Sequence, residues 1–124
     1  MTGTRGLVWF LLGAAAMGGV EAARAGHAPA TPAQAERVVL ENPRVRVLEY
    51  TSEPGGGVCG AGEHSHPAHL TVVMAAARDR EVAGGSAPQT GELKVGDVLW
   101  SEAGTHTDEN IGTTASRLLV VEIK

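Results

Sequence analysis

Three of the five histidines of this 124-residue chain lie within six positions, at His64, His66 and His69 of the stretch GEHSHPAH. A neutral imidazole nitrogen is a common ligand of divalent transition metals. His64 and His66 are two positions apart, so both side chains would point to the same side of a β-strand. This spacing predicts two ligands of one ion. The alternative is a pair of incidental polar residues at the end of a loop, because a His-x-His pair alone is a weak motif.

His106 is the candidate for a further ligand, although it lies 40 residues beyond His66. It follows the segment GDVLWSEAGT, which indicates a turn, a strand and a second turn. Two hairpins that meet inside a small barrel could bring His106 onto the same ion. The fifth histidine, His27, lies in an Ala- and Pro-rich tail and is expected to have no specific role.

Short β-strands are the elements expected to position these residues. Segments rich in β-branched residues alternate with glycine- and proline-containing turns, as in RVVLE, RVRVLEYTS, HLTVVMAAA, RDREVA, VLWSE and SRLLVVEIK. After residue 25, no window keeps apolar residues at helical spacing while avoiding glycine. Seven or eight strands with a turn signal every 8 to 12 residues predict an all-β, antiparallel sandwich or barrel.

The N-terminus has the three parts of a secretory signal peptide. MTGTR carries one arginine and no acid, residues 6–20 form an apolar run, and Ala23-Arg24-Ala25 matches a cleavage site. We therefore expect a cleavable signal helix over residues 1–25, a flexible linker over 26–36 and one domain over 37–124, in a periplasmic or secreted protein. A retained N-terminal anchor is the alternative, although the run is short for a membrane span.

The charge balance excludes some partners. The chain carries 10 basic and 14 acidic residues, a net charge of −4. This balance argues against nucleic acid, whose phosphates need clustered lysine and arginine, and it offers no basic patch for a membrane surface after signal cleavage. The expected partner is a small-molecule ligand or substrate. Because so small a domain buries a modest core, a closed barrel or a homodimer would help to stabilise it.

Cys59 is the only cysteine, so an internal disulfide is impossible. It precedes His64 by five residues, which allows it to act as a soft metal ligand or a reactive thiol. It could also form an intermolecular bridge. The interpretation we favour is a small buried residue, because free cysteine is usually buried.

The chain resembles the small single-domain cupins over about residues 38–124. EHSHPAHLTVVM stands in the place of the first cupin motif, which contains the His-x-His pair and a glutamate ligand. GDVLWSEAGTHTDEN, from Gly96 to Asn110, matches the second motif, which ends in a histidine and an asparagine. The resemblance implies an antiparallel jelly-roll barrel and a metal site formed by His64, His66, His69 and His106.

The chain departs from the cupin motifs at three points. Glu102 stands where the second motif has proline, and one residue is missing between Gly104 and His106. The glutamate ligand of the first motif is absent, and His69 falls on its position.

His69 is the ligand on which strand geometry and the resemblance disagree. In an unbroken strand His69 has the opposite parity to His64 and His66 and would face away from them. Leu70, Val72 and Met74 also form a better core face than their neighbours Thr71, Val73 and Ala75. A one-residue bulge at Pro67 would reverse the phase and turn His69 inward.

These features indicate a metal-binding cupin domain whose cofactor is a divalent transition metal, with Fe, Mn, Ni, Cu and Zn all suited to imidazole ligands. A redox metal with an open position would support a dioxygenase-type oxidoreductase, and a non-redox ion would support isomerisation or hydrolysis. The alternative is a non-catalytic module that binds a small ligand or a metal. The catalytic residues are unknown; Glu49 and Glu122 are the strand acids that could enter the barrel.

Overall fold

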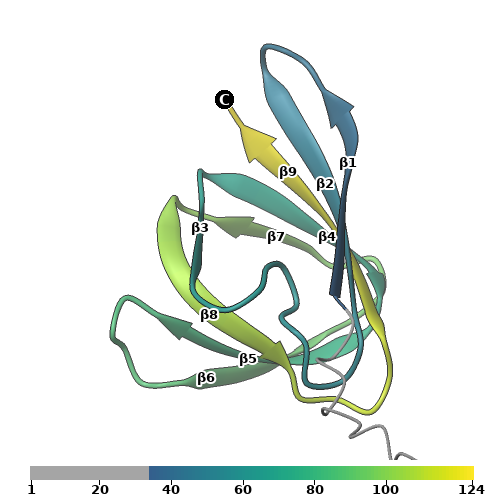
Figure 1. Ribbon diagram of the computed structural model, residues 1–124, viewed down its shortest axis with the longest axis vertical. Helices are drawn as coiled ribbons and strands as arrows, with labels where there is room; N and C mark the ends of the chain where they lie inside the picture. The colour runs from purple at the N-terminus through teal and green to yellow at the C-terminus, as the bar shows by residue number, and fades with distance from the viewer. Residues whose placement is uncertain (1–33) are drawn as a thin grey trace, which may run out of the picture.

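A computed structural model describes residues 34–124, which form nine β-strands and no helix (Figure 1). None of these residues belongs to a helix that could span a lipid bilayer. The expected signal peptide and residues 26–33 of the expected linker lie outside the described residues. Residues 34–36, also assigned to the linker from the sequence, form the start of the first strand. The strands are β1 (Gln34–Glu41), β2 (Val45–Ser52), β3 (His64–His66), β4 (His69–Ala75), β5 (Ala77–Ala83), β6 (Gln89–Leu93), β7 (Val98–Ser101), β8 (Gly104–Asn110) and β9 (Ser116–Ile123).

The strands form two antiparallel sheets. One has five strands in the order β1-β2-β9-β4-β7, and the other has four in the order β3-β8-β5-β6. The sheets face each other across the interior, and the segment between β2 and β3 lies between them (Figure 1). This architecture confirms the predicted all-β, antiparallel jelly-roll fold. One element that the strand count missed is β3, which has only three residues.

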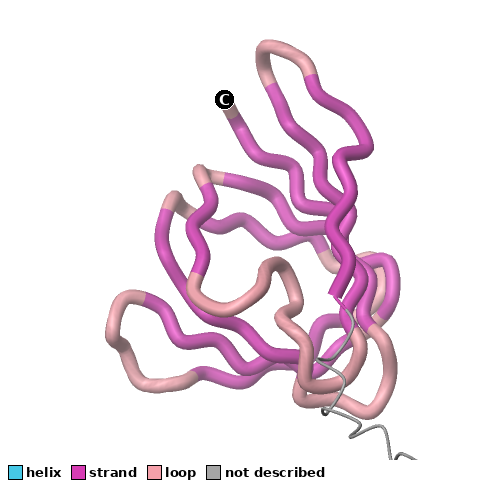
Figure 2. The backbone as a smooth tube through the Cα atoms, in the orientation of Figure 1, coloured by secondary structure: helices cyan, strands magenta, loops and turns pink. Residues whose placement is uncertain are grey.

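The apolar core comes from alternate residues of three neighbouring strands and from the segment before β3. Side chains at every second position of a strand point to the same face, so β2, β4 and β9 each contribute one row. Figure 2 shows the contributing segment before β3 as a long loop. The core residues are Leu48, Tyr50, Val58, Cys59, Val73, Leu118 and Val120.

The inward face of β4 differs from the sequence-based expectation. His69, Thr71 and Val73 are buried, whereas Met74 is 43% exposed. The expectation that Leu70, Val72 and Met74 form the core face was wrong. That expectation rested on side-chain hydrophobicity, and it failed because the outer face of the five-stranded sheet is also rich in apolar residues. The parity argument for His69 failed for another reason, because β3 belongs to the four-stranded sheet and β4 to the five-stranded sheet. Pro67 and Ala68 carry the chain from one sheet to the other, so strand alternation does not run through from His64 to His69.

The outer face of the five-stranded sheet is also rich in apolar side chains. Sheets with one solvated face usually alternate apolar and polar residues, but β4 and β9 carry aliphatic residues on both faces. Glu49, one of the two candidate interior acids, also lies on this outer side, where it pairs with Arg37 and Arg117 at 3.0 and 2.6 Å. The alternative in which Glu49 acts as an acid or base inside the barrel therefore lacks support. The large hydrophobic side chains left exposed include Leu40, Met74, Val98, Trp100 and Ile123.

Candidate metal centre

Strand pairing between β3 and β8 brings the distant His106 to His64 and His66. His64 lies directly opposite His106 in the antiparallel register, and His66 is two residues along the same strand. One nitrogen of each imidazole and the Cys59 sulfur all lie within 4.8 Å of one another. The site therefore depends on pairing between segments 40 residues apart, which brings His106 to the first two histidines.

Cys59 reaches the cluster because Asp108 holds the loop that carries it. Asp108 Oδ1 accepts a hydrogen bond from the Val58 amide at 2.7 Å, and Oδ2 accepts one from the Cys59 amide at 3.0 Å. The Cys59 thiol also donates to Asp108 Oδ2 at 2.7 Å. Its sulfur lies 3.6 Å from His64 Nε2 and 3.5 Å from His106 Nε2. Cys59 is thus both buried, as expected, and part of the polar cluster.

The imidazoles of His64 and His106 present their Nε2 atoms to each other. His64 Nδ1 lies 2.9 Å from the Gly62 carbonyl oxygen, and His106 Nδ1 faces a Glu81 oxygen at 3.4 Å. Both partners are acceptors, which assigns the proton of each neutral ring to Nδ1 and leaves a lone pair on Nε2. The two Nε2 atoms are only 2.9 Å apart. Two facing lone pairs at this distance repel unless a proton or a metal ion lies between them.

This separation fits a metal ion. With a metal–nitrogen distance of about 2.1 Å, two imidazole nitrogens at a right angle around one ion lie about 3.0 Å apart. The orienting partners at Nδ1 also match known metal sites, where the second ring nitrogen usually donates to a carbonyl or carboxylate. The donors present therefore fit a divalent transition metal.

His66 is oriented by Glu122. Its Nδ1 lies 2.9 Å from Glu122 Oε1, and its Nε2 lies 3.0 Å from the Cys59 carbonyl oxygen. The Tyr50 ring packs edge-on against the imidazole, with the ring centroids 6.2 Å apart. A nitrogen cannot donate a hydrogen bond and bind a metal at once, so ligation through Nε2 requires His66 to release the Cys59 carbonyl. Glu122, the other candidate interior acid, thus acts on His66.

His69 lies beside the cluster but outside the group of closely spaced donors. Its side chain is buried, and its ring centroid is 5.0 Å from that of His66. Its Nδ1 lies 2.8 Å from the Pro67 carbonyl oxygen, which leaves Nε2 as the available ligand atom. The structure therefore turns His69 inward through the change of sheet at Pro67 and Ala68. Its role as a fourth ligand stays a prediction.

Burial shapes the electrostatics of the site. It lowers the pKa of His106, which favours the neutral form that binds metal. Burial, followed by the Asp108 carboxylate, raises the pKa of the Cys59 thiol, so without an ion the sulfur stays protonated. Burial, with Asp108 and Glu81 adding to it, also raises the pKa of Asp79 to about 7. Asp79 Oδ1 is buried and has no hydrogen-bond partner within the part of the chain that the structure describes. Several acidic groups therefore lie close together in the interior beside the cluster. A cation would stabilise their ionised forms.

Sequence reasoning missed Asp108 and Glu81, the residues that position Cys59 and His106, for a physical reason. Asp108 is two residues beyond His106 on β8, so its inward direction follows from strand parity. That signal was available, but it becomes useful only when the partner loop is known. Glu81 meets His106 through the pairing of β5 with β8, which parity does not give.

Gly60 leaves room for the His64 ring, and we expect Gly60→Ala to weaken metal binding at least about tenfold. A Cβ atom at Gly60 would lie 2.6 Å from three atoms of that ring, so the imidazole must move. Changes that disturb the orientation of a ligand typically lower metal affinity by about 10–100-fold. Gly91→Ala is the matched control, because its Cβ would meet nothing within 4 Å. Neither glycine has a positive φ. Titration with Zn²⁺ measures the effect, and equal affinities for the two variants would contradict it.

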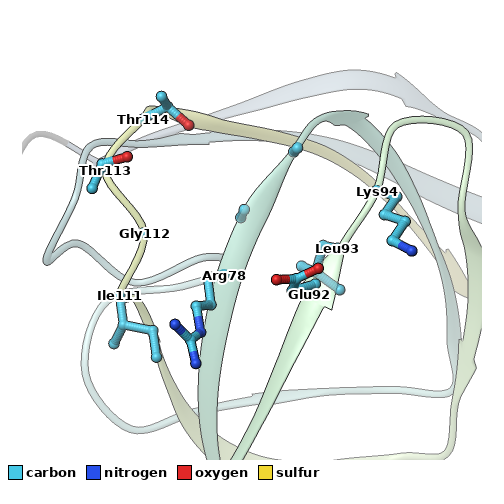
Figure 3. Close-up of a pocket in the computed structure, with 10 residues that line it drawn as sticks. Arg78, Glu92, Leu93, Lys94, Ile111, Gly112, Thr113 and Thr114 are labelled. Atoms are coloured by element: carbon cyan, nitrogen blue, oxygen red, sulfur yellow. The ribbon is translucent and has the colours of Figure 1, made fainter.

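Two cavities of several hundred Å³ adjoin the cluster, and a third of similar size is remote from it. One of about 270 Å³ is lined by His66, His69, His106 and Glu81 among others. One of about 320 Å³ is lined by Cys59, His64 and His66, together with Glu36, Arg46, Tyr50 and Glu122. The third, about 370 Å³, lies beside β5, β6 and the turn after β8, where Arg78 sits between Ile111 and Glu92 (Figure 3). The first two border the histidines directly. A smaller cavity of about 60 Å³, lined by Cys59, His69 and His106 among others, also adjoins the cluster.

Comparison with known proteins places this fold. No family model matches the sequence, and no curated protein matches it. Among solved structures, a cupin domain from Bordetella pertussis is similar with a TM-score of 0.66 and 25% identity, over 75% of this chain and 95% of that one. An RmlC-like cupin with a double-stranded β-helix fold from Methanocaldococcus jannaschii has a TM-score of 0.60 and 11% identity, over 73% and 80% of the two chains. A cupin 2 conserved barrel protein from Salinispora arenicola has a TM-score of 0.53 and 18% identity, over 71% and 73%.

These neighbours agree with the two cupin-like motifs, which meet where β3 pairs with β8. The facing antiparallel sheets and the His/Cys cluster between them fit the same assignment. The chain therefore has the fold of the small cupin domains, with which it shares its antiparallel double-stranded architecture.

Proposed function

We propose that this protein holds one divalent transition-metal ion through His64, His66 and His106 and acts on a small molecule as a dioxygenase-type oxidoreductase. The observation that carries the proposal is the pair of facing Nε2 atoms 2.9 Å apart, each on a ring whose other nitrogen faces an acceptor. Iron, manganese, nickel and copper are the redox-active ions that imidazole suits. The resemblance to cupins supports the metal, and the two larger adjoining cavities support a small-molecule substrate.

The side chains around the cluster have different roles in such a site. When bound, a redox-active ion would supply open coordination positions for a substrate and O₂. Glu122 keeps Nδ1 of His66 protonated and aligned, and Glu81 does the same for His106. Asp108 holds the Cys59 loop against the cluster. Tyr50 closes the inner wall behind His66.

The second candidate is a non-catalytic metal-binding module, and Cys59 is the observation that favours it. The Cys59 sulfur lies close enough to His64 and His106 to serve as a fourth ligand. Three imidazoles and a thiolate would fill the four positions of a tetrahedral ion, which is typical of structural sites rather than catalytic ones. The two candidates therefore differ in whether Cys59 binds the ion.

A Cys59→Ser variant loaded with Co²⁺ separates these functions. Serine keeps a donor for Asp108 but removes the soft sulfur ligand. We expect the variant to bind one ion with an affinity within about tenfold of the parent, because burial and Asp108 keep the thiol protonated. We also expect azide to change the visible spectrum of both loaded proteins by entering an open position. Loss of binding in the variant, with no response of the parent to azide, would establish the closed site. Absence of Co²⁺ binding by the parent would overturn both candidates.

A further inference from the structure

The cavity of about 320 Å³ beside the histidines contains a cationic side chain that forms no ion pair with any residue of 34–124. Arg46 lines this cavity, and its Nε atom is buried with no hydrogen-bond acceptor among the described residues. A buried donor without an acceptor destabilises the folded protein, and the effect is larger for a charged group. Such a group is expected to have a partner in the functional state of the protein.

Strand register explains why Arg46 points into the barrel. It shares the parity of Leu48 and Tyr50 on β2, both of which are buried, and it lies opposite the buried Glu122 on β9. On the other side of β2, Arg46 lies opposite Glu41 of β1, whose carboxylate binds Lys124 at 2.8 Å.

Within residues 34–124, Arg46 takes part in no ion pair, whereas the arginines at 37, 80 and 117 each pair with a glutamate. The guanidinium of Arg46 is thus held near the metal-binding histidines while remaining available to a ligand.

The charge balance of this cavity depends on the metal. The carboxylates of Glu36 and Glu122 together outweigh the single charge of Arg46. A divalent ion on His64 and His66 reverses this balance and leaves a net positive charge. The cavity on the other side of the cluster contains Glu81 and Glu102 and no lysine or arginine. An anion is therefore favoured in the Arg46 cavity, and only when the metal is bound.

We propose that this cavity binds a small molecule bearing a carboxylate, with the carboxylate on the Arg46 guanidinium and the rest of the molecule directed toward His64 and His66. The planar guanidinium fork matches the two oxygens of a carboxylate. The volume lies near the lower end of ligand pockets, which suits a small metabolite rather than a polymer. This inference rests on the proposed function, because the ion supplies the net positive charge.

Calorimetric titration of the Zn²⁺-loaded protein with acetate, succinate and benzoate, each compared with its amide, tests the proposal. We expect at least one carboxylate to bind while its amide does not. We expect Arg46→Gln to weaken that binding at least about tenfold, because a charge-assisted hydrogen bond is lost, and Arg46→Lys to lie between this variant and the parent. Arg78→Gln is the matched control. Arg78 lines the remote cavity of Figure 3 and, like Arg46, makes no ion pair within the described residues.

Metal binding is measured first, so that failure of this inference is distinguished from failure of the proposed function. Zn²⁺ binding without carboxylate binding, or with equal weakening by Arg46→Gln and Arg78→Gln, would overturn the carboxylate site alone. Failure of both Zn²⁺ and the carboxylates to bind would overturn the inference together with the proposed function. Carboxylate binding that depends on Arg46 but not on metal would support the site and contradict its link to the ion.

Discussion

A His106→Ala variant is expected to lose divalent-metal affinity by about a hundredfold or more, as severely as His64→Ala. The two imidazoles lie opposite each other across β3 and β8, with their Nε2 atoms 2.9 Å apart. Removing either one ends the facing pair and leaves His66 with a single remaining histidine partner. Changes to residues that merely orient a ligand lower metal affinity by about 10–100-fold, so loss of a ligand itself lowers the affinity at least as much. Titration with Zn²⁺, with circular dichroism to verify folding, measures the effect.

His69→Ala and His27→Ala are the comparisons for this result. His69 is adjacent to His66 but outside the closely spaced donors, so its removal is expected to weaken binding less than removal of His106. His27 lies outside the described residues, and on sequence grounds its removal is expected to change nothing. A folded His106→Ala protein that binds Zn²⁺ as tightly as the parent would refute this assignment of the metal centre.

Metal is expected to raise the melting temperature by about 10–20 °C at a hundredfold excess over Kd at pH 7.5, and by almost nothing at pH 5. Binding at this excess contributes about 2.7 kcal/mol, and each kcal/mol shifts the melting temperature of a domain of this size by about 4–8 °C. Imidazole binds metal only when it is neutral, and its reference pKa is about 6.5. Protons therefore displace the ion as the pH falls below this value.

The stability of the metal-free protein also depends on pH, and it too falls as the pH is lowered. Burial lowers the pKa of His106 in the folded state, so the unfolded chain takes up this proton first. The contribution of His106 to stability is present above a pH of about 6.5 and is lost as the pH falls toward the folded-state pKa. Melting curves with Zn²⁺ and with a chelator at each pH isolate the contribution of the metal. Coincident curves at pH 7.5 would rule out a metal site, and an undiminished shift at pH 5 would rule out imidazole ligation.

Local sequence patterns were sufficient to predict the fold class and three members of the cluster. Alternating β-branched segments punctuated by glycine and proline predicted antiparallel strands, because side chains alternate on a strand whatever its neighbours are. The same parity placed His64 and His66 on one face. The second cupin-like motif identified His106 as their partner, and the pairing of β3 with β8 places it there.

Only the tertiary structure decided which way His69 points and what surrounds the histidines. The expectation that His69 faces away from His64 and His66 failed because Pro67 and Ala68 move the chain between sheets, and parity carries no information across such a change. Asp108 meets the Cys59 loop across 49 residues, and Glu122 meets His66 across 56. Arg46 faces the same cavity through pairing with β9. A sequence states the direction of a side chain relative to its own strand, but only the folded arrangement of strands determines which side chain it meets.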